Sequence, residues 1–242
     1  MSNYALITGG TKGIGYSAAK CFAKMGYNLL LTYHADTIAA QQACTDLHET
    51  FKIDVTAIQA DSSDIQSIDI VFQHVCKHDI RLDVILFNAG ITCRDSFDEI
   101  QYDDWERVFF TNIHYPVFLL QRLLSKINSG GSILFTGSLM GILPHAQSIP
   151  YGITKAAVHA LVKNLVKFLA PRQIRVNAVA PGFVNTGWQQ NKPAELRQCI
   201  ESKIALKRFC DPDELANIYQ LLVENTYING EIIIADGGYS YN

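Results

Sequence analysis

The sequence predicts an α/β fold in which one doubly wound domain contains a seven-stranded parallel sheet with helices on both faces. Three observations indicate it. Short apolar runs alternate with longer segments of helical period from one end of the chain to the other. Each changeover contains a Gly, Pro, Asn or Asp residue, the residue types of turns. Seven strands and their connections fill the 242 residues, so we expect residues 1–242 to form a single domain.

Seven apolar segments have the length of buried strands. Their side chains are mostly apolar, as expected for parallel strands that are covered on both faces. In chain order they are Tyr4–Thr8, Asn28–Tyr33, Val55–Gln59, Val84–Phe87, Ser132–Thr136, Arg175–Val179 and Glu231–Ala235.

The connecting segments show helical spacing. One follows the first glycine cluster and another follows Lys155, and both place their apolar residues on one face of a helix. These residues are Ala18, Ala19, Phe22, Ala23 and Met25 in the first segment, and Ala156, Ala157, Ala160, Leu161, Leu165 and Phe168 in the second. The spacing predicts helices that pack against the sheet.

The segment from residue 185 to residue 206 is the least regular part of the chain. It contains Trp188, a Gln-Gln-Asn run and Pro193 before a helical stretch. We expect a mobile flap over a site here, with a plain surface excursion as the alternative.

Composition excludes several classes of protein. The 20 basic and 23 acidic residues give a net charge of −3 without long runs of one sign, which does not suggest a nucleic-acid or membrane-surface partner. No apolar stretch reaches the roughly 20 residues that cross a bilayer. The six cysteines are far apart, without CxxC or zinc spacing, so we expect neither disulfides nor a metal site. The start Met1–Tyr4 lacks a signal peptide, which predicts a cytoplasmic protein.

The first predicted strand runs into a glycine-rich turn that an alanine-rich helix follows. Its sequence is Thr8-Gly9-Gly10-Thr11-Lys12-Gly13-Ile14-Gly15, and Gly13-x-Gly15-x-x-Ala18 fits the fingerprint of Rossmann-type dinucleotide-binding domains. The glycines let the backbone approach a pyrophosphate, whose charge the helix N-terminus favours. A P-loop is excluded, because no Gly-Lys-Ser/Thr follows the required gap. The turn therefore predicts a single Rossmann-type domain that binds a dinucleotide.

The end of the second predicted strand distinguishes the two nicotinamide cofactors. An NAD-preferring site places an acidic residue there for the ribose 2′-hydroxyl, but no acid follows Tyr33 and His34 before Asp36. Lys12 could pair with a 2′-phosphate, with His34 assisting. We expect NADP (NADPH) as the cofactor and NAD as the alternative; the other interpretation of Lys12 is a solvated turn residue.

Tyr151 and Lys155 stand one helical turn apart on the same face of a predicted helix. A phenol has a pKa near 10, and lowering the pKa of Tyr151 by two to three units needs about 3–4 kcal/mol of stabilisation of the phenolate. Lys155 together with a positively charged nicotinamide could supply it. Ser138 follows the fifth predicted strand at the carboxyl end, where open α/β sheets bind ligands. Its hydroxyl could hold a substrate carbonyl oxygen beside the phenol while the nicotinamide delivers hydride.

The glycine turn, Asn88-Ala89-Gly90, Ser138 and Tyr151-x-x-x-Lys155 occur in the order and at the spacing of the short-chain dehydrogenase/reductase family, which the chain resembles over essentially its whole length. The resemblance implies that Ser138 orients the substrate and that Tyr151 is the catalytic acid and base. It implies that Lys155 binds the nicotinamide ribose while lowering the tyrosine pKa. Asn112 matches the helix asparagine that helps to bind a water for proton relay.

The resemblance also implies the cofactor contacts. Asp61 matches an aspartate that contacts the adenine, and Asn88-Ala89-Gly90 matches the turn on the far side of the cofactor. Residues 181–186 match a segment that packs on the nicotinamide, and Thr186 can reach the nicotinamide carboxamide. The cofactor-binding residues expected in this way are Gly9, Thr11, Lys12, Gly13, Ile14, Gly15, Tyr33, His34, Asp61, Asn88, Ala89, Gly90, Tyr151, Lys155, Pro181, Gly182, Val184 and Thr186.

Within the family, the chain looks most like the 3-oxoacyl-(acyl-carrier-protein) reductases of fatty acid biosynthesis, which reduce a 3-oxoacyl thioester to the 3-hydroxy form with NADPH. This resemblance implies an acyl-thioester substrate, an acyl-carrier protein as a candidate partner, and a homotetramer. Two positions depart from the pattern. Arg172 lies where a basic residue that holds the carrier is expected, but Ser129-Gly130-Gly131 stands where these reductases have a basic cluster. The chain also has Ile91-Thr92-Cys93-Arg94-Asp95 where they commonly have Ile-Thr-Arg-Asp, so that a cysteine precedes the arginine.

Other functions remain open on the same residues. A general carbonyl reductase, or a dehydrogenase of sugars, polyols or hydroxysteroids, would use the same set, because Tyr151 serves as acid in one direction and as base in the other. A catalytically silent NADPH-binding regulator is the alternative outside the enzymes, and the intact Ser138, Tyr151 and Lys155 argue against it.

Overall fold

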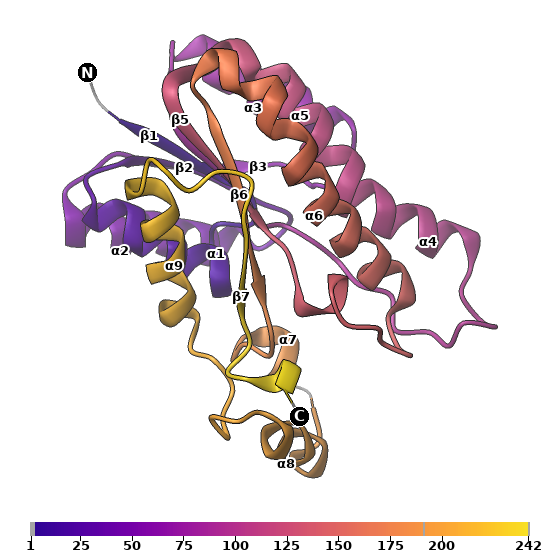
Figure 1. Ribbon diagram of the computed structural model, residues 1–242. Helices are drawn as coiled ribbons and strands as arrows, with labels where there is room; N and C mark the ends of the chain where they lie inside the picture. Colours follow the sequence, from indigo (N-terminus) through magenta and orange to yellow (C-terminus); the bar gives the residue numbers. More distant parts are fainter. Residues whose placement is uncertain (1–2, 191, 242) are drawn as a thin grey trace.

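A seven-stranded, all-parallel sheet forms the centre of the computed structural model, which describes residues 3–190 and 192–241 (Figure 1). The strand order is β3-β2-β1-β4-β5-β6-β7. The order reverses between β1 and β4, and a doubly wound sheet binds its ligand at this switch point. The strands are β1 (Tyr4–Ile7), β2 (Asn28–Tyr33), β3 (Val55–Gln59), β4 (Leu82–Phe87), β5 (Ile127–Thr136), β6 (Arg175–Pro181) and β7 (Ile232–Ala235). The predicted α/β fold with seven parallel strands is confirmed.

Helices cover both faces of the sheet, with α1, α2 and α9 on one side and α3, α4, α5 and α6 on the other (Figure 1). Alternate residues of each strand face the two layers, so Leu6 packs in one apolar cluster and its neighbours Ala5 and Ile7 in the other. The helices are α1 (Gly13–Lys24), α2 (Thr37–Phe51), α3 (Gln66–Lys77), α4 (Tyr102–Phe109), α5 (Tyr115–Leu123), α6 (Ile149–Leu169), α7 (Gly187–Gln190), α8 (Ala194–Lys203) and α9 (Pro212–Glu224).

The strand boundaries depart most from the expected ones at β5. The sequence places its start at Ser132, but the strand begins at Ile127, and Leu82 of β4 pairs with Ile127 before a shift of register. Asn128, Ser129 and the two following glycines hide this extension, because they interrupt the apolar run. The bulge leaves the functional carboxyl end of β5 in regular register with β4 and β6.

The region predicted as a flap contains the two short helices α7 and α8, and residue 191 lies outside the described residues. Over residues 3–190 and 192–241, no helix combines the length and the apolar character that crossing a bilayer requires. The six cysteines are free thiols.

Candidate active site

The candidate active site lies where the carboxyl ends of β1, β4, β5 and β6 meet. Thr8, which follows β1, is buried, and its Oγ1 accepts hydrogen bonds of 3.0 Å from the N–H groups of both Asn88 and Ala89, which follow β4. The Asn88 amide donates in return to the carbonyl oxygens of Thr8 and Gly9, at 3.2 Å each. Thr136, the last residue of β5, donates to Asn88 Oδ1 at 3.2 Å. The turns after three neighbouring strands are therefore bonded into one rigid edge.

The glycine turn before α1 requires glycine at several positions. Gly9 and Gly13 have φ angles of +62° and +54°, which favour glycine. A Cβ at Gly15 would lie 2.2 Å from the Gly9 carbonyl oxygen and 2.6 Å from the Asn88 amide nitrogen. Lys12, the N-cap of α1, makes no side-chain cap, which leaves the first N–H groups of the helix available to an anion. The residues present fit the pyrophosphate of a dinucleotide.

The other predicted contacts of the glycine turn lie close by. The Thr186 methyl stands 3.4 Å from the position that a Gly13 Cβ would take, so the segment after β6 reaches the turn. Gly182 has no room for a side chain either, because its Cβ would lie 2.9 Å from Asp236. Pro181 and Val184 are buried, whereas Thr11 and Ile14 are half-buried in the turn and at the start of α1. The structure thus brings the two predicted cofactor segments together.

The residues expected around the adenosine come from the glycine turn and from the ends of β2 and β3, and Lys12 and His34 each have a carboxylate partner. Lys12 Nζ forms an ion pair with Asp36, whose other carboxylate oxygen caps α2 by accepting from the Ala39 N–H at 3.0 Å. His34 Nε2 lies 3.2 Å from Asp61. The pKa of the Asp36 carboxyl is lowered from its ordinary value, and the hydrogen bond with Lys12 is the largest cause. These groups are exposed, with 61% and 49% of the Lys12 and Asp36 side chains open to solvent. Tyr33 is half-buried beside them as the last residue of β2.

Ser138, Tyr151 and Lys155 meet at the end of β5. Ser138 is buried and its Oγ accepts from the Met140 N–H at 3.1 Å, and its side chain acts on the pKa of Tyr151 by lowering it. Lys155 Nζ donates to the carbonyl oxygen of Thr136 at 2.7 Å and lies 5.4 Å from the centre of the Tyr151 ring. A substrate oxygen placed between the two hydroxyl groups would contact both an orienting group and a proton donor.

In the chain alone the pKa of Tyr151 is raised, whereas the lowering expected from the sequence involves Lys155 together with a bound nicotinamide. Burial raises the pKa of Tyr151 to about 12, and the hydrogen bond with Ser138 offsets only part of the rise. The Trp188 ring of α7 lies over the phenol, with ring centres 5.8 Å apart. Burial also lowers the pKa of Lys155 to about 8. The lysine ammonium bonds to a backbone carbonyl and faces the tyrosine ring, so its charge does little for the phenolate.

Asn112 lies in a π-helical turn (Phe110–His114) between α4 and α5, where the backbone widens. Its Oδ1 accepts from the Ile91 N–H at 2.9 Å, and its amide donates to the Ile91 carbonyl at 3.0 Å and to Thr154 Oγ1 at 2.9 Å. Thr154 donates to the carbonyl oxygen of Tyr151 at 2.8 Å. Gly90 lies beside this group, because a Cβ added at Gly90 would lie 3.1 Å from Asn112 Oδ1 and 3.6 Å from the Lys155 ammonium. Asn112 thus connects the turn after β4 to α6, the helix that carries Tyr151 and Lys155.

The structure adds residues that the sequence reasoning missed. Asp36 neutralises Lys12, Thr154 links Asn112 to Tyr151, and His159 accepts from the Ser138 N–H at 3.4 Å. The spacing contained a signal for His159, since it follows Lys155 by one helical turn on the same face. Nothing in the spacing singles out Asp36 as a partner of Lys12.

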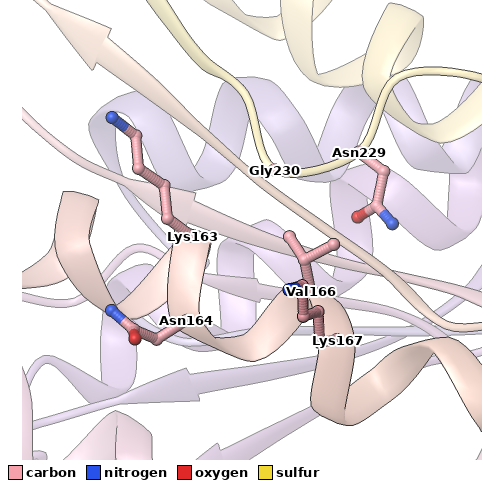
Figure 2. A pocket seen from close by; sticks show the side chains of 6 residues that line it. All are labelled: Lys163, Asn164, Val166, Lys167, Asn229 and Gly230. Atoms are coloured by element: carbon pink, nitrogen blue, oxygen red, sulfur yellow. The ribbon is translucent and has the colours of Figure 1, made fainter.

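Two other features lie apart from this group. Cys93 is buried with its Sγ 3.2 Å from Asp95, and burial raises the pKa of the thiol, which opposes a nucleophilic role. A hollow of about 460 Å³ lies between α6 and the loop before β7, and Figure 2 shows the residues that line it. None of the predicted site residues lines it; the lining residues are Lys163, Asn164, Val166, Lys167, Asn229 and Gly230. Among the described residues, no cluster of three or more His, Cys, Asp or Glu side chains could hold a metal ion.

Comparisons with known proteins agree with this geometry. A family model described as enoyl-(acyl carrier protein) reductase matches residues 9–240. The 3-oxoacyl-(acyl-carrier-protein) reductase FabG of Aquifex aeolicus is 30% identical over 238 residues, which cover 97% of this chain and 96% of the relative. The uncharacterized oxidoreductase YmfI of Bacillus subtilis is 32% identical over 244 residues, which cover 99% of this chain and 99% of the relative.

Solved structures show the same fold over almost the whole chain. A short-chain dehydrogenase from Burkholderia cenocepacia, determined in complex with NADP, has a TM-score of 0.91 at 30% identity and covers 98% of both chains. A short-chain dehydrogenase/reductase from Serratia marcescens has a TM-score of 0.93 at 28% identity, also covering 98% of both. The chain therefore belongs to the short-chain dehydrogenase/reductase family of oxidoreductases.

Proposed function

We propose that this protein reduces a ketone to a secondary alcohol with NADPH, and that its substrate is a 3-oxoacyl thioester of acyl-carrier protein or coenzyme A. The single observation that carries the reaction is the meeting of Ser138, Tyr151 and Lys155 beside Gly90 in the turn after β4. The thioester class is supported by the relatives that are named 3-oxoacyl-(acyl-carrier-protein) reductases.

The residues divide the work of reduction. Ser138 holds the carbonyl oxygen, and Tyr151 donates its phenolic proton to that oxygen as the alcohol forms. In the chain without cofactor Tyr151 is protonated at neutral pH, so it holds the proton that a reduction requires. When bound, NADPH supplies the hydride for the carbonyl carbon. Lys155, whose ammonium lies beside Gly90, would bind the nicotinamide ribose, and Asn112 would hold a water for proton relay.

The proposed cofactor-binding residues are the eighteen residues named from the sequence. Among them, Asp61 would contact the adenine and Thr186 the nicotinamide carboxamide. The absence of an acid directly after β2 supports NADPH over NADH. Asp36, however, already neutralises Lys12, so the preference for NADPH depends on whether a 2′-phosphate displaces that carboxylate.

An acyl-carrier protein is a candidate partner. Arg172 is exposed on the surface and donates to the carbonyl oxygen of Leu124 at 3.1 Å, while Lys126 lies 3.7 Å from Asp79. The carbonyl oxygen is neutral, so Arg172 keeps a positive charge that an acidic carrier could contact, whereas the charge of Lys126 is paired with Asp79. The alternative substrates are a simple ketone, a sugar or polyol, and a hydroxysteroid.

A panel of substrates tests the proposal. Acetoacetyl-carrier protein, acetoacetyl-coenzyme A, a simple cyclic ketone and a keto sugar are compared by kcat/KM with NADPH and with NADH. The proposal expects the thioesters to exceed the other substrates by at least about tenfold. Equal efficiency on the ketone or the sugar would make the protein a general carbonyl reductase. Tight NADPH binding without turnover of any substrate would make it a cofactor-binding regulator.

We also propose a homotetramer, on the basis of exposed apolar residues on regular elements. Ile234 of the edge strand β7 is 47% exposed, and Phe118 of α5 and Phe168 of α6 are 46% and 59% exposed. Light scattering during size-exclusion chromatography would show about four times the chain mass of 26.9 kDa. A monomer would contradict the proposal.

A further inference from the structure

His159 is a buried titratable residue with no part in the reaction described above. It lies on α6 one turn after Lys155, and only 8% of its surface is exposed. Its ring faces the loop from Gly137 to Gly141, which carries Ser138. The loop follows β5 directly, since the Gly137 N–H still donates to the Val179 carbonyl of β6 at 2.7 Å.

The loop is shaped around the imidazole ring. A Cβ at Gly137 would lie 2.3 Å from His159 Nε2, and a Cβ at Gly141 would lie 2.9 Å from its Cε1. Both ends of the loop therefore have glycine where the ring approaches. The Ser138 N–H lies between them and donates to Nε2 at 3.4 Å.

The charge state of His159 follows from its surroundings. Burial lowers its pKa to about 4, and the charges of Lys155 and Lys163 on the same helix act in the same direction. The ring is therefore neutral at physiological pH, with one nitrogen that accepts and one that donates. Since Nε2 accepts from Ser138, Nδ1 carries the proton and is the nitrogen left for the hydrogen bond with the backbone of Gly141.

We infer that His159 is a positioning residue, which clamps the backbone of the Ser138 loop at both ends and thereby keeps Ser138 Oγ beside Tyr151. Among the described residues, the hydrogen bond to this hydroxyl comes from the Met140 N–H of the same loop, so its place depends on the loop backbone. This inference rests on the proposed function, in which Ser138 holds the substrate carbonyl oxygen.

Two substitutions separate positioning from packing. His159→Gln keeps a group that can both accept from Ser138 and donate to Gly141, whereas His159→Leu fills similar space and does neither. With acetoacetyl-coenzyme A and NADPH, we expect His159→Leu to lower kcat about tenfold, because the Ser138 N–H is left unpaired. We expect His159→Gln to stay within about twofold of wild type, and neither variant to change the affinity for NADPH by more than about twofold.

Val162→Ala is the matched control. Val162 is fully buried on α6, in the apolar cluster between the sheet and the helices α3, α5 and α6. The Val162→Ala substitution therefore lowers stability without removing a contact with the Ser138 loop. We expect its kcat to stay within about twofold of wild type at a temperature where it is folded. Equal losses of kcat in His159→Leu, His159→Gln and Val162→Ala would overturn the inference, because packing alone would then explain them.

A measurement on the wild-type protein makes the outcome independent of turnover. Two-bond ¹H–¹⁵N spectra of the histidine rings, assigned by the signal lost in His159→Gln, report which nitrogen carries the proton. We expect a neutral Nδ1–H tautomer at pH 7. A proton on Nε2 would overturn the clamp, since that nitrogen could not accept from Ser138. If no substrate turns over, the proposed function fails, and the tautomer still decides whether His159 holds the loop.

Discussion

The two ends of the proposed cofactor site, the catalytic end around Asn112 and Lys155 and the adenosine end around Lys12 and His34, differ in how their polar groups are held. At the catalytic end, Asn112 and Lys155 are 3% and 4% exposed, and their bonds run to backbone groups or to other buried side chains. At the adenosine end, Lys12 and His34 are exposed and are held only by carboxylates at the surface. Both ends lie at the carboxyl edge of the same sheet, with Lys155 bonded to the end of β5 and His34 just after β2, so the fold alone does not explain the difference.

The difference shows where tertiary structure controls chemistry. Burial shifts the pKa of Tyr151, Lys155 and His159, and each buried bond has no water to replace it. The exposed pairs are screened by solvent and salt, so they adjust selectivity at a small cost. Substitutions at the catalytic end should therefore have large effects on rate or stability, and those at the adenosine end small effects on cofactor choice.

The largest effect is expected from Tyr151→Phe, which removes only the phenolic hydroxyl. We expect turnover to fall by about 10²–10⁴-fold, the usual contribution of a general acid, while the NADPH dissociation constant stays within about twofold. Steady-state rates and fluorescence titration with NADPH measure the two quantities. Unchanged turnover would refute the chemistry assigned to this residue and the contrast between the two ends.

The next effect concerns the pH dependence of stability. The pKa of His159 is about 4 in the folded chain against an ordinary value of 6.5, so the unfolded chain takes up a proton first as the pH falls. Stability is therefore lost between pH 6.5 and pH 4, by about 3 kcal/mol for this shift.

Urea unfolding of wild type and His159→Gln at pH 7 and pH 4 checks this value. The free energy of unfolding should fall less in the variant, by about that amount. An equal fall in both proteins would show that His159 is protonated in the folded state and is not shielded as the structure indicates.

A smaller effect is expected from Asn112→Ala, which leaves the backbone N–H of Ile91 without its partner. The free energy of unfolding should fall by about 1–3 kcal/mol. Asn164→Ala is the matched control, because the Asn164 amide donates to a backbone carbonyl at the exposed surface of α6, and we expect a change of at most about 0.5 kcal/mol. Similar losses in both variants would remove the distinction between buried and exposed hydrogen bonds.

The smallest effect is expected at the adenosine end. Asp36→Ser keeps an oxygen that can cap α2 and removes the negative charge beside Lys12. We expect the ratio of kcat/KM for NADPH to that for NADH to rise about threefold, a change within the usual strength of a surface ion pair, and to rise less at high salt.

Asp213→Asn provides the control for Asp36→Ser, since it removes an exposed carboxylate that pairs with Lys20 on another part of the surface. Its cofactor ratio should equal that of wild type. No change of the ratio in Asp36→Ser would show that Lys12 does not contact the 2′-phosphate.

The sequence by itself determined the fold and the order of the site along the chain. Apolar runs and glycine turns are local signals, and they predicted all seven strands, with β2 and β3 correct to the residue. The spacing of Ser138, Tyr151 and Lys155 likewise predicted their meeting, because parallel strands end on one edge of the sheet and one helical turn separates Tyr151 from Lys155. The start of β5 was missed where polar residues interrupt the run.

Only the tertiary structure decided how these residues are charged and held. The pairing of Lys12 with Asp36 and the clamp of His159 on the Ser138 loop join residues more than twenty positions apart, and no local period encodes them. The raised pKa of Tyr151 depends on burial of the phenol, which the one-turn spacing leaves open, as it does the direction of the Lys155 ammonium. Local periodicity thus specifies where the backbone runs, whereas desolvation and hydrogen bonding between distant segments determine the chemistry at its end.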